Sequence, residues 1–527
     1  MTRTRWTPTT RAAVLAALLA TVVALLILAA PGSARADEPE RPVLLVGIPG
    51  LRWSDSDQLA GVLNPLLHER GDLAVGSLVV RSTGATACPV DGWLGISAGN
   101  RASDARGDSG CAPLESPTAP GWQTAWSRYV ERADAASFTA EPGLLGDALA
   151  EAGVTASAIG AGAGLAIATR TGDIEAYQPY LPESAEGQVR EALVDDDLVV
   201  VDMGAARLDE ASEEPRQAML SGIAEELEAI LAGAADSGRD PVVLISGISD
   251  SVGAEAATLG FFVATGVHDV AQISSSSTRQ PGYLLATDQH ATLLDLLGLD
   301  DGGTSSIGGP MTLTSADAGA LIDAAQDRER HAEAQRPLIP GFFLSLVLIN
   351  LTLYAAVTLA LRRRGFARKV ADRREPVLRT MRVVSLAVAA IPVSSYLANL
   401  LPWWRFEPAL LALVAGIAVI GSAIVALALL PTWRRSLLGP AAVVAGVTAI
   451  VLAIDVITGA RLQVSAIMGI PTLVAGRFYG MNNTTFALFS TALLIVATAV
   501  ANSLVKRDRR VLAAAVVAGI GIVGIVI

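Results

Sequence analysis

The residues best placed for chemistry follow apolar runs in the first part of the chain. Asp202 ends the run Leu198–Val201, and Asp250 comes shortly after the run Val242–Gly247. Such near-continuous apolar runs are typical of strands buried on both faces of a parallel sheet. Ligands bind beyond the carboxyl ends of such strands. We therefore expect a site, if there is one, among segments 49–53, 202–206 and 249–253.

Both aspartates also have a purely structural interpretation. Asp250 lies in a Ser-Asp-Ser segment of the kind that forms turns and caps helices, and Asp202 can cap the loop after its strand. Histidine is scarce, with four in the whole chain. Unless they bind a metal, we expect His268 and His290 to be surface residues or hydrogen-bonded core residues.

Cys88 and Cys111 are the only two cysteines. We expect a disulfide between them, because exported domains fold in an oxidising compartment. Two unpaired buried thiols are the alternative. A zinc site is not expected here, since no CxxC motif or histidine cluster accompanies the two cysteines.

A second polar group interrupts the apolar C-terminal part of the chain. Asp455 and Arg461 flank the end of an apolar run, and Arg477 and Asn482 follow in a segment rich in Gly and Asn. Ionisable groups in or near a bilayer are costly, so they tend to pair or to line a cavity. We expect Asp455 to pair with Arg461 or Arg477 and the group to bind a lipid headgroup or a partner protein. The alternative is an interfacial loop whose arginines extend to the headgroups.

The N-terminal segment predicts export. Arg3, Arg5 and Arg11 precede the uncharged apolar run 12–30, and Ala34-Arg35-Ala36 offers small residues for cleavage. We expect residues 1–36 to be a signal peptide or, because the run is long, an uncleaved signal anchor. In either case residues 37–336 lie outside the cytoplasm.

Residues 337–527 predict an α-helical transmembrane bundle. Arginine-rich loops follow the first, third and fifth apolar spans, and the positive-inside rule places these loops in the cytoplasm. This orientation agrees with the export signal. The last span runs to Ile527, which also fits a bundle cut short at its C-terminus. The six spans have about the length that a bilayer core requires and cover 338–361, 382–400, 407–430, 437–458, 484–504 and 511–527.

The net charge and the preference for arginine over lysine indicate which class of protein this is. The net charge of −12 comes from the part before residue 337, and an acidic domain argues against nucleic acid, whose phosphates need basic partners. Lys369 and Lys506 are the only lysines among many arginines, a preference typical of high-GC, actinobacterial coding. We expect a multi-pass protein of a bacterial plasma membrane, with the lipid bilayer as its first partner.

Residues 37–336 alternate short apolar runs with alanine-rich helical stretches. This alternation predicts an α/β domain with a mainly parallel sheet and helices on both faces. Besides the two runs above, we expect strands at 42–48, 74–80 and 156–160, and helices at 144–152 and 216–234.

Three segments of this domain resemble the alkaline phosphatase superfamily, which includes sulfatases, phosphodiesterases and lipoteichoic-acid synthases. Leu144–Val154 is similar to the family's helix-then-strand element, and Ser249–Gly253 stands where the family has a Ser-Asp-His-Gly turn. Ala286–Gly298 resembles its late Thr-Asp-x-x-Pro-Thr-Leu-Leu helix. The resemblance covers much of residues 42–300. It implies that fold and, in the active enzymes, two divalent metals beside a Ser or Thr nucleophile.

The chain departs from the family at the positions that would hold metal. Ile48-Pro49-Gly50 replaces the first metal-binding Asp, Ser251 replaces the His after Asp250, and no His follows Asp202. The site that the resemblance implies would place Zn, Mn or Mg on Asp202, Asp250, Asp288 and His268, with Thr86 or Ser97 as nucleophile.

These departures favour a pseudoenzyme: a phosphatase-like domain without metals that serves binding or assembly in envelope biogenesis, with envelope glycolipids or other membrane proteins as partners. The membrane part also resembles that of actinobacterial envelope proteins that join such a domain to a helical bundle. The second hypothesis is a metal-dependent phospho- or sulfo-ester hydrolase or transferase acting on envelope glycolipids. The third is a transporter-like bundle with an accessory α/β domain.

Overall fold

The computed structural model of the chain describes most residues from Arg41 onward. The described ranges are 41–106, 110–204, 213–251, 254, 256–267, 269–300, 305–362, 374–434, 436–474, 476 and 478–526. The predicted export signal, residues 1–36, lies outside them, and so do His268 and Arg477.

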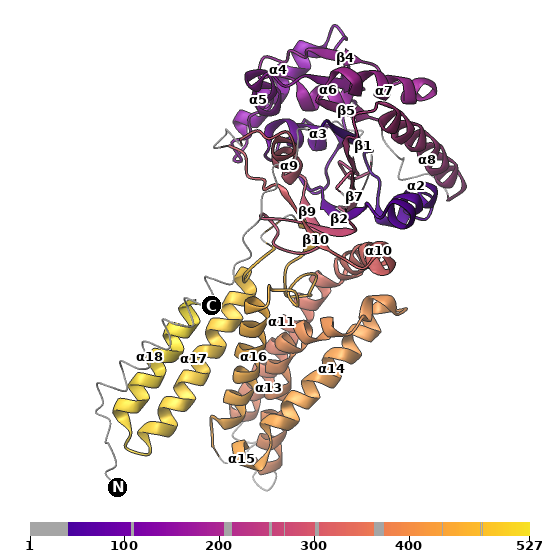
Figure 1. Ribbon diagram of the computed structural model, residues 1–527. Helices are drawn as coiled ribbons and strands as arrows, with labels where there is room; N and C mark the ends of the chain where they lie inside the picture. Colours follow the sequence, from indigo (N-terminus) through magenta and orange to yellow (C-terminus); the bar gives the residue numbers. More distant parts are fainter. Residues whose placement is uncertain are drawn as a thin grey trace, which may run out of the picture. The chain divides into compact units, whose positions relative to one another are not determined.

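A ten-stranded mixed sheet organises the N-terminal part of the described chain (Figure 1). The strands follow the order β10-β8-β2-β7-β6-β1-β5-β3-β4, and β9 pairs with β2. From β6 to β4 all neighbours are parallel. The strands are β1 (Val43–Gly47), β2 (Ala74–Val79), β3 (Ala156–Ile159), β4 (Ala176–Gln178), β5 (Leu198–Asp202), β6 (Val242–Ser246), β7 (Leu259–Thr265), β8 (Ala271–Ser275), β9 (Tyr283–Leu285) and β10 (Met311–Ser315).

Helices cover both faces of this sheet, which explains why its central strands are apolar throughout. Val43 and Leu45 of β1 pack into one core with α3, α4, α5, α6 and α9, whereas Leu44 and Val46 pack into a second core with α2, α7, α8 and α10. Alternate side chains of a strand point to opposite faces, so both sets must be apolar. The helices are α2 (Ala60–Asn64), α3 (Pro89–Ala98), α4 (Trp122–Ala135), α5 (Leu144–Ala152), α6 (Ala161–Ile167), α7 (Ala185–Asp195), α8 (Glu213–Asp236), α9 (Asp288–Leu296) and α10 (Ala318–Gln335).

The predicted α/β class with a mainly parallel sheet is confirmed, but strands β4, β7, β8, β9 and β10 were not predicted, and β10 runs antiparallel to β8. Strand β7 runs antiparallel to both β6 and β2. It follows β6, and the described residues of the connecting loop, 247–251, 254 and 256–258, contain no helix. A strand that returns from such a loop beside its predecessor must run antiparallel, because a parallel neighbour requires a crossover to the other end of the sheet.

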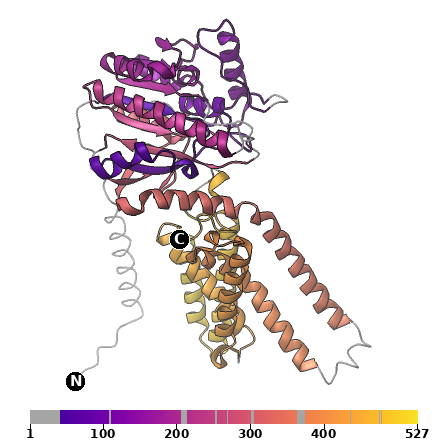
Figure 2. The same ribbon diagram turned by 90° about the vertical axis from the view of Figure 1, so that its right-hand side faces the viewer.

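Apolar helices make up the C-terminal part, as predicted for a helical membrane domain, and run alongside one another (Figure 2). Among the described residues, five helices are long and apolar enough to cross a membrane, and α18 is a shorter apolar helix. The helices are α11 (Leu338–Arg362), α13 (Arg374–Leu397), α14 (Ala409–Ala428), α15 (Pro431–Arg434), α16 (Gly439–Ile457), α17 (Asn483–Val505) and α18 (Arg510–Val526).

Candidate functional site

The carboxyl ends of the central strands meet at one edge of the sheet. Gly47 at the end of β1 is in register with Asp202 at the end of β5 and with Ser246 at the end of β6. This is the edge at which open parallel sheets bind their ligands. It is also where the sequence places two of its candidate aspartates.

Apolar side chains fill this edge. The Trp93 ring, from α3, is fully buried and lies so close to Gly47 and Gly162 that a Cβ on either glycine would come within 2.2 Å or 2.0 Å of a ring atom. On the next strand end, Ile248 packs against Gly92, where a Cβ would meet its Cγ2 at 2.5 Å. The glycines are therefore needed for close packing, and the crevice contains an indole and an isoleucine where a ligand would lie.

Asp202 is held by two backbone amides. Its Oδ2 accepts a hydrogen bond from Gly162 N at 2.7 Å, and its Oδ1 accepts one from Gly204 N at 3.0 Å. The side chain is buried, and burial raises its pKa. Asp202 thus fixes the start of α6 and the turn after β5, as expected of a capping residue.

Asp250 is fully buried and joins two segments that are distant in the sequence. Its Oδ2 accepts from Ala87 N at 2.8 Å, and its Oδ1 accepts from Thr258 N at 2.8 Å and Thr258 Oγ1 at 3.1 Å. Burial raises the pKa of Asp250 to about 6, although these donors act in the opposite direction. The residue fixes the loop before α3 to the loop that leads into β7.

Asp288, in the first turn of α9, is bonded in the same way. Its Oδ2 accepts from Ser275 Oγ at 2.6 Å and Leu285 N at 2.8 Å, and its Oδ1 accepts from Gly309 N at 3.0 Å. Burial raises its pKa as well. All six carboxylate oxygens of Asp202, Asp250 and Asp288 therefore accept hydrogen bonds from the protein itself.

The two nucleophile candidates are also engaged. Thr86 Oγ1 accepts a hydrogen bond from Arg106 Nη1 at 3.0 Å, and Arg106 also contacts the Thr86 carbonyl. Ser97 is fully buried, and its Oγ accepts from Gly143 N at 2.9 Å just before α5. Neither hydroxyl has a histidine or carboxylate as a hydrogen-bond partner among the described residues, so neither has the base that would activate a nucleophile.

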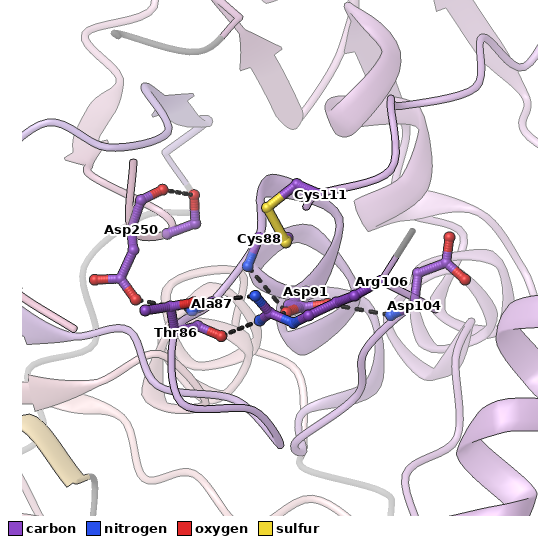
Figure 3. The surroundings of a disulfide bond; sticks show 9 residues. Thr86, Ala87, Cys88, Asp91, Asp104, Arg106, Cys111 and Asp250 are labelled. Atoms are coloured by element: carbon purple, nitrogen blue, oxygen red, sulfur yellow. Dashed lines mark hydrogen bonds and ion pairs between the residues drawn. A yellow bond between two sulfur atoms is a disulfide. The ribbon is translucent and has the colours of Figure 1, made fainter. Parts of the chain in front are cut away.

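A disulfide joins Cys88 to Cys111 next to this segment (Figure 3). Cys88 is the residue before α3, and its N–H donates to Asp91 Oδ2 at 2.9 Å, while Asp104 N donates to Asp91 Oδ1 at 3.1 Å. Burial raises the pKa of Asp91 to about 6, and the Arg106 guanidinium lies 3.4 Å from its Oδ2. Together these contacts hold Asp104, Arg106 and Cys111 next to the N-terminus of α3.

The histidines do not complete a metal site. His290 is fully buried, and its Nδ1 lies 2.8 Å from the Ile96 carbonyl. His331 stacks on Trp404 with 3.7 Å between the ring centres. Nowhere in the described part of the chain does a group of three or more His, Cys, Asp or Glu residues have an arrangement that could hold a metal ion. The described residues therefore do not fit the two-metal centre that the resemblance implied.

Three of the four polar residues predicted near the membrane helices are described by the structure, namely Asp455, Arg461 and Asn482. Asp455, at the end of α16, accepts from Leu462 N at 2.7 Å and Gln463 Nε2 at 3.0 Å. Asn482 caps α17, where its Oδ1 accepts from Thr485 N at 2.7 Å. Arg461 lines a cavity together with Asp455, and Arg477 lies outside the described residues. Amide donors of the turn after α16 thus hold Asp455, whereas we expected it to pair with Arg461 or Arg477.

Sequence reasoning missed the contribution of Trp93 and Arg106 to this region. Both lie between the two cysteines or next to them in the sequence, but no spacing rule predicts that an indole fills a strand-end crevice. In the sequence, Gly47 and Gly162 are the signal that could have indicated this packing, because a glycine often stands where a bulky side chain comes close to the backbone.

Comparison with known proteins gives similarity in structure only. No protein-family model matches the sequence, and no curated protein matches it. Similar solved structures include a protein of the alkaline phosphatase superfamily from Vibrio parahaemolyticus, with 14% identity over 52% of this chain and 70% of that chain and a TM-score of 0.34. Murine ectonucleotide pyrophosphatase/phosphodiesterase 5 has 10% identity over 52% of this chain and 100% of that chain, with a TM-score of 0.31.

A third similar structure comes from a Bacteroides thetaiotaomicron locus for glycosaminoglycan metabolism, with 12% identity over 52% of this chain and 76% of that chain and a TM-score of 0.30. The first of these three structures is described as a member of the alkaline phosphatase superfamily. At these identities and TM-scores the likeness carries no information on a metal, a substrate or an activity of this chain.

Proposed function

We propose that this protein is a multi-pass plasma-membrane protein whose alkaline phosphatase-like domain is not catalytic and serves binding or assembly in cell-envelope biogenesis. The observation that carries the proposal is the hydrogen bonding of Asp202, Asp250 and Asp288. Each oxygen that would have to bind a cation accepts from an amide or hydroxyl of the protein instead. The Trp93 ring, packed against Gly47, adds a steric reason.

The first test is the metal content and turnover of the purified full-length protein. We expect no stoichiometric Zn, Mn or Mg by elemental analysis, and no hydrolysis of phosphodiester or sulfate-ester substrates above a buffer control. Stoichiometric metal together with turnover that is lost in Asp250→Ala would reject the proposal and make the protein a metal-dependent ester hydrolase.

The second test is genetic complementation in the source bacterium. A strain without the protein is expected to have an envelope defect, which Asp202→Asn should restore to the wild-type phenotype because the amide keeps an acceptor for Gly162 N. A catalytic ligand would not tolerate that change. Failure of Asp202→Asn in a protein that is folded and normally abundant would count against a non-catalytic role.

The proposed domain boundaries are 1–36 for a signal peptide or anchor, 37–336 for the extracytoplasmic domain and 337–527 for the membrane domain. They are supported by the arginine-rich loops after the first, third and fifth apolar spans. Cysteine labelling tests the orientation, because both native cysteines are in a disulfide. Asp134→Cys in α4 should react with an impermeant maleimide in intact cells, whereas Trp433→Cys in α15 should react only after permeabilisation. The reverse pattern would overturn the orientation.

A further inference from the structure

A cavity of about 830 Å³ lies between the α/β domain and the outer ends of α13 and α16. Its walls come from β8 and β10 on one side and from α16 and the loop that follows it on the other. The volume is in the range of small-molecule sites, about 300–1,000 Å³. None of the candidate catalytic residues lines this cavity, so it is separate from the strand-end region described above.

Specific contacts fix the two walls with respect to each other. Gln280 Nε2 donates to the carbonyls of Gly459 at 2.6 Å and Phe478 at 2.9 Å, and Gln335 Nε2 donates to the Ala466 carbonyl at 2.6 Å. The Tyr283 ring packs against Phe478 with 5.7 Å between the ring centres. Hydrogen bonds and a ring contact therefore hold the two walls together, and the cavity between them is open to the surface.

One end of the cavity is apolar and belongs to the membrane helices. Val451 and Ile454 line it from α16, and Leu400 lines it from the 3-10 helix Ala398–Leu400 that follows α13. Ile454 and Leu400 are also 57% and 70% exposed. Since α16 and the segment that ends at Leu400 have the length and composition of membrane spans, we expect these side chains to contact hydrocarbon. The apolar end is thus continuous with the lipid-facing surface.

The other end is polar and offers a positive charge. Arg461 is exposed and, within the described part of the chain, its side chain has no ion pair or hydrogen bond. Opposite lie Gln272 and Thr314, which face each other across the β8–β10 pair. Asp455 also lines the cavity, but its oxygens already accept from Leu462 N and Gln463 Nε2. The guanidinium is therefore the charged group left to meet a ligand.

We infer that this cavity binds a membrane amphiphile with an anionic headgroup, whose chain lies along Val451, Ile454 and Leu400 and whose headgroup meets Arg461. A charged group next to a hydrocarbon-facing wall is the pattern that such a molecule requires. A peptide is a poorer occupant, because its backbone would lack hydrogen-bond partners where the wall faces lipid. The inference goes beyond the proposed function and does not depend on whether the α/β domain is catalytic.

Native mass spectrometry of the full-length protein in detergent tests the inference, with three probes added in turn. These are phosphatidylglycerol, zwitterionic phosphatidylcholine, and glycerol 1-phosphate, which has the anionic group without chains. We expect one phosphatidylglycerol to be retained in preference to phosphatidylcholine. We expect glycerol 1-phosphate not to compete at the same concentration.

Two variants probe the two ends of the cavity, each with a matched control. Arg461→Gln removes the charge and should weaken phosphatidylglycerol binding about tenfold, as expected for one charge-assisted contact, while phosphatidylcholine binding stays unchanged. Ile454→Trp fills the apolar end and should weaken binding of both lipids. Arg434→Gln in α15 and Ile450→Trp, one turn earlier on α16, change the same residue types outside the cavity and should bind as wild type does.

Three results would overturn the inference. The first is equal phosphatidylglycerol retention by Arg461→Gln and Arg434→Gln. The second is equal retention by Ile454→Trp and Ile450→Trp. The third is competition by glycerol 1-phosphate as strong as that by the lipid, which would make this a site for a soluble phosphate. Each variant is accepted only if its thermal unfolding matches that of wild type. Should Ile454→Trp not fold, Arg461→Gln alone still decides the outcome.

Discussion

Replacing Asp250 by alanine distinguishes a structural carboxylate from a metal ligand. In the structure this side chain is fully buried, accepts from Ala87 N and from Thr258 N and Oγ1, and has a pKa raised to about 6 from an ordinary 3.8. A group whose folded pKa is raised contributes stability that is fully present below its unfolded pKa and is lost as the pH rises through the folded pKa. Wild type should therefore gain stability from Asp250 as the pH falls from 7.5 to 5.

The size of this gain follows from the two pKa values. One pKa unit corresponds to about 1.4 kcal/mol, and at pH 5 Asp250 is mostly protonated in the folded state but ionised in the unfolded state. The gain between pH 7.5 and pH 5 is then about 1.4 kcal/mol, and Asp250→Ala cannot show it. At pH 7.5 the variant loses hydrogen bonds to two buried amides, at about 1–3 kcal/mol each, but is relieved of a buried charge. The destabilisation should be modest at pH 7.5 and about 1.4 kcal/mol larger at pH 5.

The assay is urea unfolding of the full-length protein in detergent, followed by the fluorescence of its buried tryptophans at both pH values, with and without a chelator. Asp91, whose pKa is also raised to about 6, remains in both proteins, so its titration largely cancels. Asp134→Ala, an exposed position in α4, is the control and should have little effect at either pH. A bound cation would lower the pKa of its ligand. Destabilisation that shrinks toward pH 5, or that disappears with chelator, would therefore refute the structural interpretation.

Three further changes test the surroundings of the site. Gly47→Ala should destabilise the domain by about 1–3 kcal/mol, because its Cβ would lie 2.2 Å from the Trp93 ring; Trp93→Leu should relieve this in a double-mutant cycle, and additive effects would contradict the packing. Cys88→Ser with Cys111→Ser should cost about 3 kcal/mol in the chain-entropy model, since the bridge spans 23 residues; a reducing agent should lower wild-type stability and leave the double variant unchanged. Burial and the neighbouring Glu333 raise the pKa of Glu329 to about 7, so wild type should lose about 2–3 kcal/mol between pH 5 and pH 8 as Glu329 ionises. Glu329→Gln should flatten that part of the profile, and an unchanged slope would show that another group titrates.

The sheet could be predicted from the sequence where apolar runs form strands. The runs at 42–48, 156–160 and 242–247 correspond to β1, β3 and β6 within a residue or two, because a strand buried on both faces needs an uninterrupted apolar run. Strand β7 was not predicted. Its run, 259–265, is equally apolar, but only its pairing with β6 and β2 gives it a direction, and pairing depends on residues far away in the chain.

The sequence could not predict whether the candidate carboxylates are free to bind a cation, because this also depends on residues far away in the chain. Asp202 and Asp250 were placed correctly at strand ends, but their donors Gly162 and Ala87 are 40 and 163 positions away. Whether a carboxylate oxygen remains available for a cation depends on those donors. The missing histidines predicted a degenerate site, and the hydrogen bonds support this prediction with contacts that the sequence does not reveal.

The packing and the hydrogen bonds at the strand ends also stabilise the scaffold. A metal centre leaves polar side chains at a strand edge that only a cation can satisfy, whereas here Trp93 fills the space and backbone amides satisfy the carboxylates. A domain bonded in this way is complete without a ligand at that edge. Arg461 is an exposed charged group that lines a separate cavity, next to the membrane helices. If the protein serves binding, as we propose, we expect the ligand at the cavity that the α/β domain shares with the end of α16.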